Sequence, residues 1–333
     1  MTRMGFAKRI EGALPRLTRV TVAVAMAGLL ALAGCATEEE PVGVEASVSE
    51  AVEEAPDQDA VGAPVEPEQE AQAPEPEPVV SALESYTWDE LSQISAEIAA
   101  AENEEAAIEV AKQYELCTPD GRLDGTQVKS VTLSDGTQTT VQIAGFAHDN
   151  KTEGGKAGIT FIFGDAIASH DMNSDDSNDG GWEDSQMRSW LESDVAVMLP
   201  HDLAEKIVAV DKLTNNVGKT KKVSSVSTTS DSLWLYSAVE VRGIHDHTNG
   251  GVYNDIENAE GSEYKLFSDM GIEADSESDI LVKTYQGNPI NWWYRTPEGF
   301  RASDFNCVRK DGLPCVSSAD ATEIYGVVPG FCI

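Results

Sequence analysis

Basic residues are absent from a long N-terminal part of this chain, and the acidic region within that part has few residues that can form a core. No Lys or Arg occurs between Arg19 and Lys112, whereas fifteen Asp or Glu residues fall between Glu38 and Glu84. The acidic region also contains seven prolines and no aromatic residue. Such a segment cannot bury enough apolar surface to offset the entropy of ordering it. We therefore predict that residues 35–82 form a disordered acidic stalk.

The charge of the whole chain narrows the range of its partners. Its formal net charge at pH 7 is -35. A chain this acidic has no basic surface to neutralise a row of phosphates, which excludes nucleic acid as a partner. Its 333 residues, of which 41% are hydrophobic, allow one sizeable core or at most two domains.

The first 34 residues have the organisation of a signal peptide. Five basic residues precede an apolar stretch, residues 20–33, that is short for a membrane span. The stretch runs into LAGC, a tetrapeptide that resembles the lipobox of bacterial lipoproteins. The resemblance implies cleavage of residues 1–34, lipidation of Cys35 with diacylglycerol and palmitate, and anchoring on the extracellular face of a bacterial cell membrane. An ordinary secretory signal with an incidental cysteine is the alternative.

After the predicted stalk, the sequence pattern first predicts a helical segment. Thr87 followed by Glu90 fits a capping box, the reciprocal hydrogen bonding that starts many helices. Apolar residues then recur at helical spacing, which predicts one helix or a helical pair from Trp88 to Tyr114. We assign residues 83–116 to this helical segment.

From Val128 onward the pattern is that of strands. Residues 128–149 contain two β-like runs around the turn SDG, which predicts a hairpin, and GITFIF predicts a third strand. Four later apolar runs predict short strands: SLWLYS, NWWYRTP, FNCVRKDGLPC and GVVPGFCI. Strands and helices mix without βαβ regularity. We therefore predict an α+β module with a mainly antiparallel sheet over residues 117–333.

Once Cys35 is set aside, an even number of cysteines remains, which favours two disulfides in an exported protein. The four are Cys117, Cys307, Cys315 and Cys332. Cys307 and Cys315 flank the turn signal DG at residues 311–312, so a hairpin would bring this pair within bonding reach. Cys117 and Cys332 then remain. The rival pairing, Cys117–Cys315 with Cys307–Cys332, stays open.

Two groups of aromatic residues are the candidate ligand contacts. They are Trp234 with Tyr236, and Trp292 with Trp293 and Tyr294. Successive side chains of a strand point to opposite faces of the sheet. We therefore expect one face of each group in the core and the other exposed, where it would stack on a sugar or form an interface. Core burial of both faces is the alternative.

The loop DMNSDDSNDGG has the acidic character of a calcium site. Its candidate ligands are Asp171, Asn173, Asp175 and Asp179. The first three alternate as the ligands of an EF-hand do. However, Asp176 stands where an EF-hand loop needs Gly, and Trp182 stands where it needs a bidentate Glu. We therefore predict a polar surface loop, and no metal or other cofactor.

Four stretches occur in an order that resembles a family of bacterial surface and lipoprotein modules of unknown function. They are GGWEDSQMRSWL (180–191), SLWLYSAVE (232–240), NWWYRTP (291–297) and GVVPGFCI (326–333). The resemblance covers residues 144–333. It implies that a set of residues holds a helix against the sheet, namely Trp182, Arg188, Trp190 and Leu191. It also implies that Arg188 meets a buried carboxylate or carbonyl, because an unpaired Arg is costly to bury.

That family is similar in turn to the C-type-lectin-like fold, which formylglycine-generating enzymes and variable bacterial ligand-binding proteins have. The similarity implies a compact α+β module whose first and last strands pair, with chain ends close enough for a Cys117–Cys332 disulfide. Of the sugar-binding motifs of calcium-dependent lectins, this sequence has only Asn288-Pro289. The reactive cysteine pair of formylglycine-generating enzymes has no secure counterpart.

We therefore expect a cell-surface lipoprotein with a non-catalytic binding module for a glycan, a cell-wall component or a protein ligand. One alternative is an enzyme or enzyme accessory related to formylglycine-generating enzymes, which would have a free cysteine of low pKa in a cleft. Another alternative is a purely structural wall spacer, which would have no concave aromatic surface.

Overall fold

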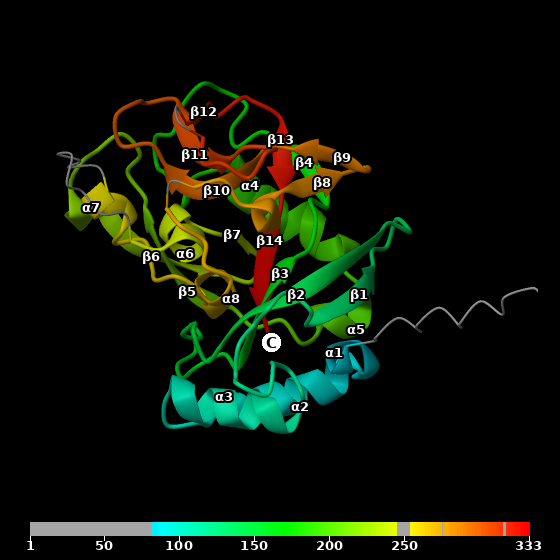
Figure 1. Cartoon of the computed structure of the whole chain (residues 1–333). Helices are drawn as coiled ribbons and strands as arrows, with labels where there is room; N and C mark the ends of the chain where they lie inside the picture. The colour runs from blue at the N-terminus through cyan, green and yellow to red at the C-terminus, as the bar shows by residue number, and fades with distance from the viewer. Residues whose placement is uncertain (1–80, 245–253, 275, 316–317) are drawn as a thin grey trace, which may run out of the picture. The chain divides into compact units, whose positions relative to one another are not determined.

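The computed structural model in Figure 1 describes residues 81–244, 254–274, 276–315 and 318–333. These residues all belong to one unit of the chain, Pro74–Ile333. The predicted signal peptide, the lipidation site Cys35 and the predicted stalk up to residue 80 lie outside the described residues.

A pair of helices opens the described part of the chain. α2 (Trp88–Ala99) begins after Thr87, whose side chain accepts a hydrogen bond from the Glu90 amide, while the Glu90 carboxylate accepts one from the Thr87 amide. This reciprocal arrangement confirms the predicted capping box. α3 (Glu104–Gln113) follows, so the predicted helical region is a helical pair. The short α1 (Ala82–Ser85) precedes both helices.

The helical segment shares one apolar core with the strands. The ring of Trp88 meets the ring of Phe161 edge-on, with 5.7 Å between their centroids. Leu91 and Ile98 of α2 are buried in the same cluster as the strand residues. The two helices lie together against one end of the sheets (Figure 1). They are therefore part of the folded unit rather than a separate body.

The first sheet is antiparallel throughout, with the strand order β1-β2-β3-β14-β7. Its strands are β1 (Val128–Thr132), β2 (Gln138–Phe146), β3 (Ile159–Phe163), β7 (Trp234–Leu235) and β14 (Pro329–Cys332). β1 and β2 form the predicted hairpin, and β3 is the predicted third strand. β14 comes from the C-terminal end of the chain, yet it lies in the interior of the sheet between β3 and β7 (Figure 1).

The second sheet has the order β12-β11-β10-β13-β4, in which β10 and β13 are parallel and the other pairs are antiparallel. Its strands are β4 (Ala168–His170), β10 (Trp292–Pro297), β11 (Asp304–Val308), β12 (Ala319–Asp320) and β13 (Tyr325–Val327). The closing run GVVPGFCI was predicted as one strand, but it divides at Val328 between the two sheets. The last residues of the chain therefore pass directly from the second sheet into the first and connect the two.

Two further hairpins complete the strands. They are β5 (Val210–Asn215) with β6 (Val226–Asp231), and β8 (Lys283–Tyr285) with β9 (Asn288–Ile290). The prediction of an α+β fold with mainly antiparallel sheets is therefore confirmed.

Short helical elements connect the strands. They are α4 (Gln186–Trp190), η1 (Leu191–Val195), η2 (Ala196–Met198), α5 (His201–Ala204), η3 (Val223–Ser225), α6 (Ala238–Arg242), α7 (Asn254–Glu257), α8 (Lys265–Asp269) and η4 (Asp279–Leu281). The helical path breaks at Leu199–Pro200, because proline cannot continue the hydrogen bonding of the preceding turn. Within the described ranges, no helix is long and apolar enough to cross a membrane.

Candidate functional site

The aromatic residues that were predicted to contact a ligand are all buried. At most 1% of each side chain is exposed in the set Trp234, Tyr236, Trp292, Trp293 and Tyr294. All six residues of β10 are buried, because both faces of this strand are covered. Two of the rings use their polar atoms internally: Trp293 Nε1 donates a hydrogen bond to the His170 carbonyl at 2.9 Å, and the Tyr236 hydroxyl donates one to the Phe161 carbonyl at 3.0 Å. Trp234 Nε1 is buried and has no hydrogen-bond partner among the described residues. The prediction of a ligand surface on these five residues is therefore wrong.

A cluster of buried charges lies among these aromatic rings. Lys212 Nζ is 2.9 Å from Asp149 Oδ1 and 2.6 Å from Glu240 Oε1. Arg295 binds the same Glu240 carboxylate with two nitrogens, at 2.5 and 2.9 Å. Lys212 Nζ also lies 4.7 Å from the centroid of the Trp234 ring, where the face of the ring attracts a cation. Two cations and two carboxylates therefore neutralise each other out of contact with water.

Neutral groups complete the hydrogen bonding of Asp149. The Tyr264 hydroxyl donates to Oδ1 at 2.8 Å and the Thr160 hydroxyl donates to Oδ2 at 2.7 Å. The thiol of Cys332 donates to Oδ2 at 3.4 Å. Burial is the largest single effect and disfavours the carboxylate, but the charges of Lys212 and His148 and the hydrogen bonds from Thr160 and Lys212 together outweigh burial and hold the pKa of Asp149 well below its ordinary value. Asp149 is therefore ionised across the physiological range.

A third buried carboxylate, Glu260, adjoins this cluster. Its Oε1 accepts a hydrogen bond from the Asn215 amide at 2.8 Å, and its Oε2 accepts one from the Thr296 hydroxyl. Burial raises the pKa of Glu260 to about 8. A protonated Glu260 fits the charge balance, because the two cations already have their two carboxylates. Burial likewise raises the pKa of the nearby Glu257, to about 7.

The stretches that carry the family resemblance build this interior. Arg188 Nε donates to Asp231 Oδ1 at 2.5 Å, and Trp182 Nε1 donates to Asp231 Oδ2 at 3.2 Å. Asp231 is fully buried, so the prediction that Arg188 meets a buried carboxylate is confirmed. Glu240 also caps α6 by accepting a hydrogen bond from the Ser237 amide at 3.0 Å. These residues hold the fold together and leave no open site.

The cysteine predictions are half correct. Cys307 and Cys315 form the expected disulfide, with 5.3 Å between their Cα atoms. Cys117 and Cys332 are both free and buried, so the predicted bridge between them is wrong, and the rival pairing is absent too. The reason is topological: Cys332 lies on an interior strand of the first sheet, where its thiol faces Asp149 and Thr160. Burial raises the pKa of both free thiols.

The acidic loop closes onto the start of α4. Asn173 Oδ1 accepts a hydrogen bond from the Gln186 amide at 2.9 Å, and Asn173 Nδ2 donates one to the Ser177 carbonyl at 2.7 Å. Asp171 pairs with the His170 ring at 2.8 Å. In the part of the chain that the structure describes, no three His, Cys, Asp or Glu side chains are grouped so that they could hold a metal ion. The candidate ligands Asp171, Asp175 and Asp179 therefore do not converge on a point where a metal ion could bind.

A polar cleft of about 470 Å³ opens between the β1–β2 and β8–β9 hairpins. It is lined by Asp135, Thr137, Gln138, Thr139, Thr140, Asp165, Ala166, Ile167, Thr284, Tyr285, Gln286 and Gly287. Asp165 Oδ1 accepts hydrogen bonds from the Thr284 amide and hydroxyl at 2.7 and 2.9 Å, which ties the loop after β3 to the β8–β9 hairpin. The hydroxyl of Thr139 is buried here and has no hydrogen-bond partner among the described residues. Sequence reasoning missed this cleft, because its residues come from three separate turns.

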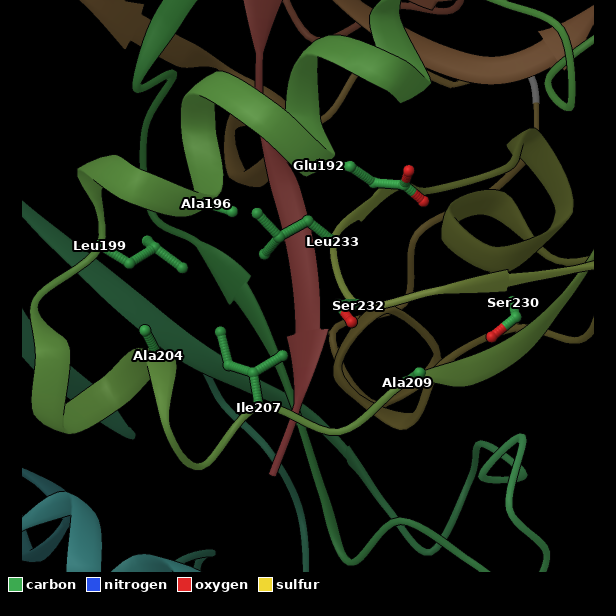
Figure 2. Close-up of a pocket in the computed structure, with 9 residues that line it drawn as sticks. All are labelled: Glu192, Ala196, Leu199, Ala204, Ile207, Ala209, Ser230, Ser232 and Leu233. Carbon is green, nitrogen blue, oxygen red and sulfur yellow. The ribbon is translucent and has the colours of Figure 1, made fainter.

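A second pocket, of about 360 Å³, lies between the η1–α5 region and β6–β7 (Figure 2). Its walls are aliphatic, and three polar side chains lie along one side. No residue of this pocket was a candidate in the sequence.

Residues 157–333 match a family described as Domain of unknown function (DUF6273). Neither the curated proteins nor the solved structures contain a match to this chain. The matched segment holds all of the four stretches on which the predicted family resemblance rested. It begins just before β3 and extends through β14.

Proposed function

The chain belongs to the DUF6273 family, a domain of unknown function, and we propose that it is a lipid-anchored surface protein whose folded part binds a hydroxylated ligand without catalysis. We propose further that the ligand is a glycan or a glycan-containing wall fragment, and that it enters the polar cleft between the β1–β2 and β8–β9 hairpins. The composition and size of this cleft carry the proposal.

The cleft offers the groups that a sugar needs. Its threonine hydroxyls and glutamine amides both donate and accept hydrogen bonds, and its two aspartates accept them. Tyr285 is half-buried at the β8–β9 turn and adds an aromatic surface. The volume falls within the roughly 300–1,000 Å³ typical of ligand pockets. The unpartnered hydroxyl of Thr139 is a position where a ligand group or an ordered water would complete a hydrogen bond.

The proposed fold family is that of C-type-lectin-like modules. The supporting observation is the pairing of β3 with β14, in which Thr160 lies opposite Cys332. These are the first and last strands of the segment that matches the family. Their pairing brings the two ends of the module together, as the resemblance implied.

The proposed anchor is the lipid on Cys35, with residues 35–82 as the spacer. A chain of that length reaches roughly 40 Å as a coil and roughly 140 Å as polyproline II. The acidic stalk would hold the module away from the membrane on the extracellular face of a bacterial cell, where wall glycans are available.

Two observations favour binding over the alternatives. The enzyme alternative needs an accessible cysteine of low pKa, whereas the free cysteines in the described ranges, Cys117 and Cys332, are buried and have raised pKa values. The spacer alternative needs no concave surface, whereas the cleft is one.

A glycan and wall-fragment binding screen on the full-length protein tests the proposal. Gln138→Ala and Thr139→Val each remove a cleft group, so each should weaken binding between about twofold and tenfold, the effect of one lost hydrogen bond. Thr139→Val should not lower the melting temperature, because the hydroxyl that it removes has no partner. Thr228→Val, on the exposed surface of β6, is the matched control and should bind as the parent does. Absence of any glycan ligand, or an equal loss in Thr228→Val, would refute the cleft as the site.

A further inference from the structure

The pocket in Figure 2 has an aliphatic side and a polar side. The aliphatic groups are Ala196, Leu199, Ala204, Ile207, Ala209 and Leu233. Most of them gather on one side in Figure 2, whereas Glu192, Ser230 and Ser232 lie on the other. No aromatic ring lines the pocket. A ligand that fits must therefore combine a saturated apolar part with a polar group at one end.

The polar side carries a net negative charge. A terminal nitrogen of Arg188 lies 3.3 Å from the Glu192 carboxylate, but Arg188 Nε is already bound to the buried Asp231 carboxylate at 2.5 Å. One cation thus faces two carboxylates, which leaves a formal charge of about minus one here. Glu192 is 47% exposed, so its carboxylate is accessible to a ligand. A cationic group is the complement of this side, and an anionic group is disfavoured by it.

The aliphatic side is held in place by the core. Leu233 and Leu199 are buried, at 1% and 6% exposure, and Leu203 of α5 anchors the facing helix with no exposed surface. The Ser230 carbonyl accepts a hydrogen bond from Arg188 at 3.0 Å, which ties the polar side to the same framework. The pocket is therefore built by ordered elements before any ligand arrives, which lowers the entropic cost of binding.

We propose that this pocket is a second binding site, which takes a primary ammonium group carried on a short aliphatic chain, as in the side chain of a lysine residue. The ammonium contacts Glu192 and the two serine hydroxyls, and the methylene groups lie against the alanines and leucines. An aromatic amine gains no ring stacking here, since the lining has none. The site is independent of the polar cleft, because the two share no residue.

Titration of the full-length protein with n-hexylammonium chloride, followed by nuclear magnetic resonance, tests the site. The neutral isostere 1-hexanol should bind about twofold to fivefold more weakly, the range of a solvent-exposed ion pair. Shortening the amine from six to three carbons should weaken binding by up to about fourfold for each methylene group removed. Ala204→Leu fills the pocket from an exposed position and should abolish binding.

Two glutamate variants test whether binding of the amine depends on the charge of Glu192. Glu192→Gln should reduce the affinity for hexylammonium to that for hexanol. Glu205→Gln removes the same charge from a neighbouring carboxylate, 58% exposed, that does not line the pocket, and it should leave the affinity unchanged. Equal binding of amine and alcohol, equal losses in the two glutamate variants, or undiminished binding to the Ala204→Leu variant would each overturn the proposal.

Discussion

Arg295 and Glu240 form a two-bonded ion pair in the protein interior, with Nη1–Oε2 and Nη2–Oε1 distances of 2.5 and 2.9 Å. The two residues lie 55 positions apart in the sequence. Glu240 belongs to the stretch SLWLYSAVE and Arg295 to NWWYRTP, so the pair joins two of the stretches on which the family resemblance rests. Glu240 also contacts Lys212, at 2.6 Å. This one carboxylate therefore contacts both buried cations, and Asp149 supplies the second negative charge through Lys212.

Removal of that carboxylate should be strongly destabilising. Glu240→Gln leaves Lys212 and Arg295 buried with a single carboxylate between them, so we expect a loss of about 3–5 kcal/mol in the free energy of unfolding. Urea unfolding of the full-length protein measures it. Glu205→Gln, an exposed carboxylate, should change stability by less than about 0.5 kcal/mol. A loss below about 1 kcal/mol in Glu240→Gln would contradict the structural role of the pair.

Because of Glu260, the free energy of unfolding should fall as the pH is raised. Its pKa is raised from 4.5 to about 8, so the folded state holds a proton that the unfolded state releases. The resulting stability is complete below about pH 4.5 and is lost as the pH rises through about 8. Glu260→Gln mimics the protonated carboxyl, so it should lessen the loss of stability between pH 5 and pH 8, by up to about 1.4 kcal/mol per pH unit.

Glu257 and the Glu205→Gln variant provide comparisons for the pH dependence of stability in Glu260→Gln. Glu257, whose pKa is raised to about 7, acts in the same direction, so Glu260→Gln should retain a smaller loss that is complete near pH 7. Glu205→Gln should keep the full pH dependence of the parent. Identical pH profiles for parent and Glu260→Gln would show that Glu260 is ionised in the folded protein.

The free cysteines should be countable. In a Cys35→Ser background, the unreduced protein should titrate two thiols when it is denatured, since Cys307 and Cys315 are bonded to each other. The folded protein should react slowly, because both free thiols are buried and have raised pKa values. Cys117→Ser and Cys332→Ser should each lower the count by one. A denatured protein without thiols would instead indicate a Cys117–Cys332 bridge.

The lipid anchor should be separable from the fold. Cys35→Ser removes the sulfur that accepts the lipid, so the protein should leave the detergent phase and lose the mass of the diacylglycerol. Its melting temperature should not change, because residue 35 lies outside the unit that contains the described residues. Cys117→Ser is the matched control and should partition with the detergent as the parent does. An unchanged partition of Cys35→Ser would mean that another feature holds the protein at the membrane.

The sequence by itself determined the features that depend on near neighbours. Thr87 and Glu90 are three residues apart, so the capping box needs only the local helix. The β1–β2 hairpin and the Cys307–Cys315 disulfide likewise form across short turns. Patterning was also sufficient for the α+β class, because alternation and helical spacing reflect one buried face of each element.

Only the tertiary structure decided which other segments of the chain cover each helix and strand. Alternation in NWWYRTP indicates two faces of a strand, but other segments bury both, so no ring of Trp292, Trp293 or Tyr294 remains for a ligand. Cys332 lost its predicted partner because β14 inserts between β3 and β7. Both cavities are made of residues from distant turns and strands. Burial, charge pairing and cavities depend on contacts across the chain, and no local pattern of residues encodes those contacts.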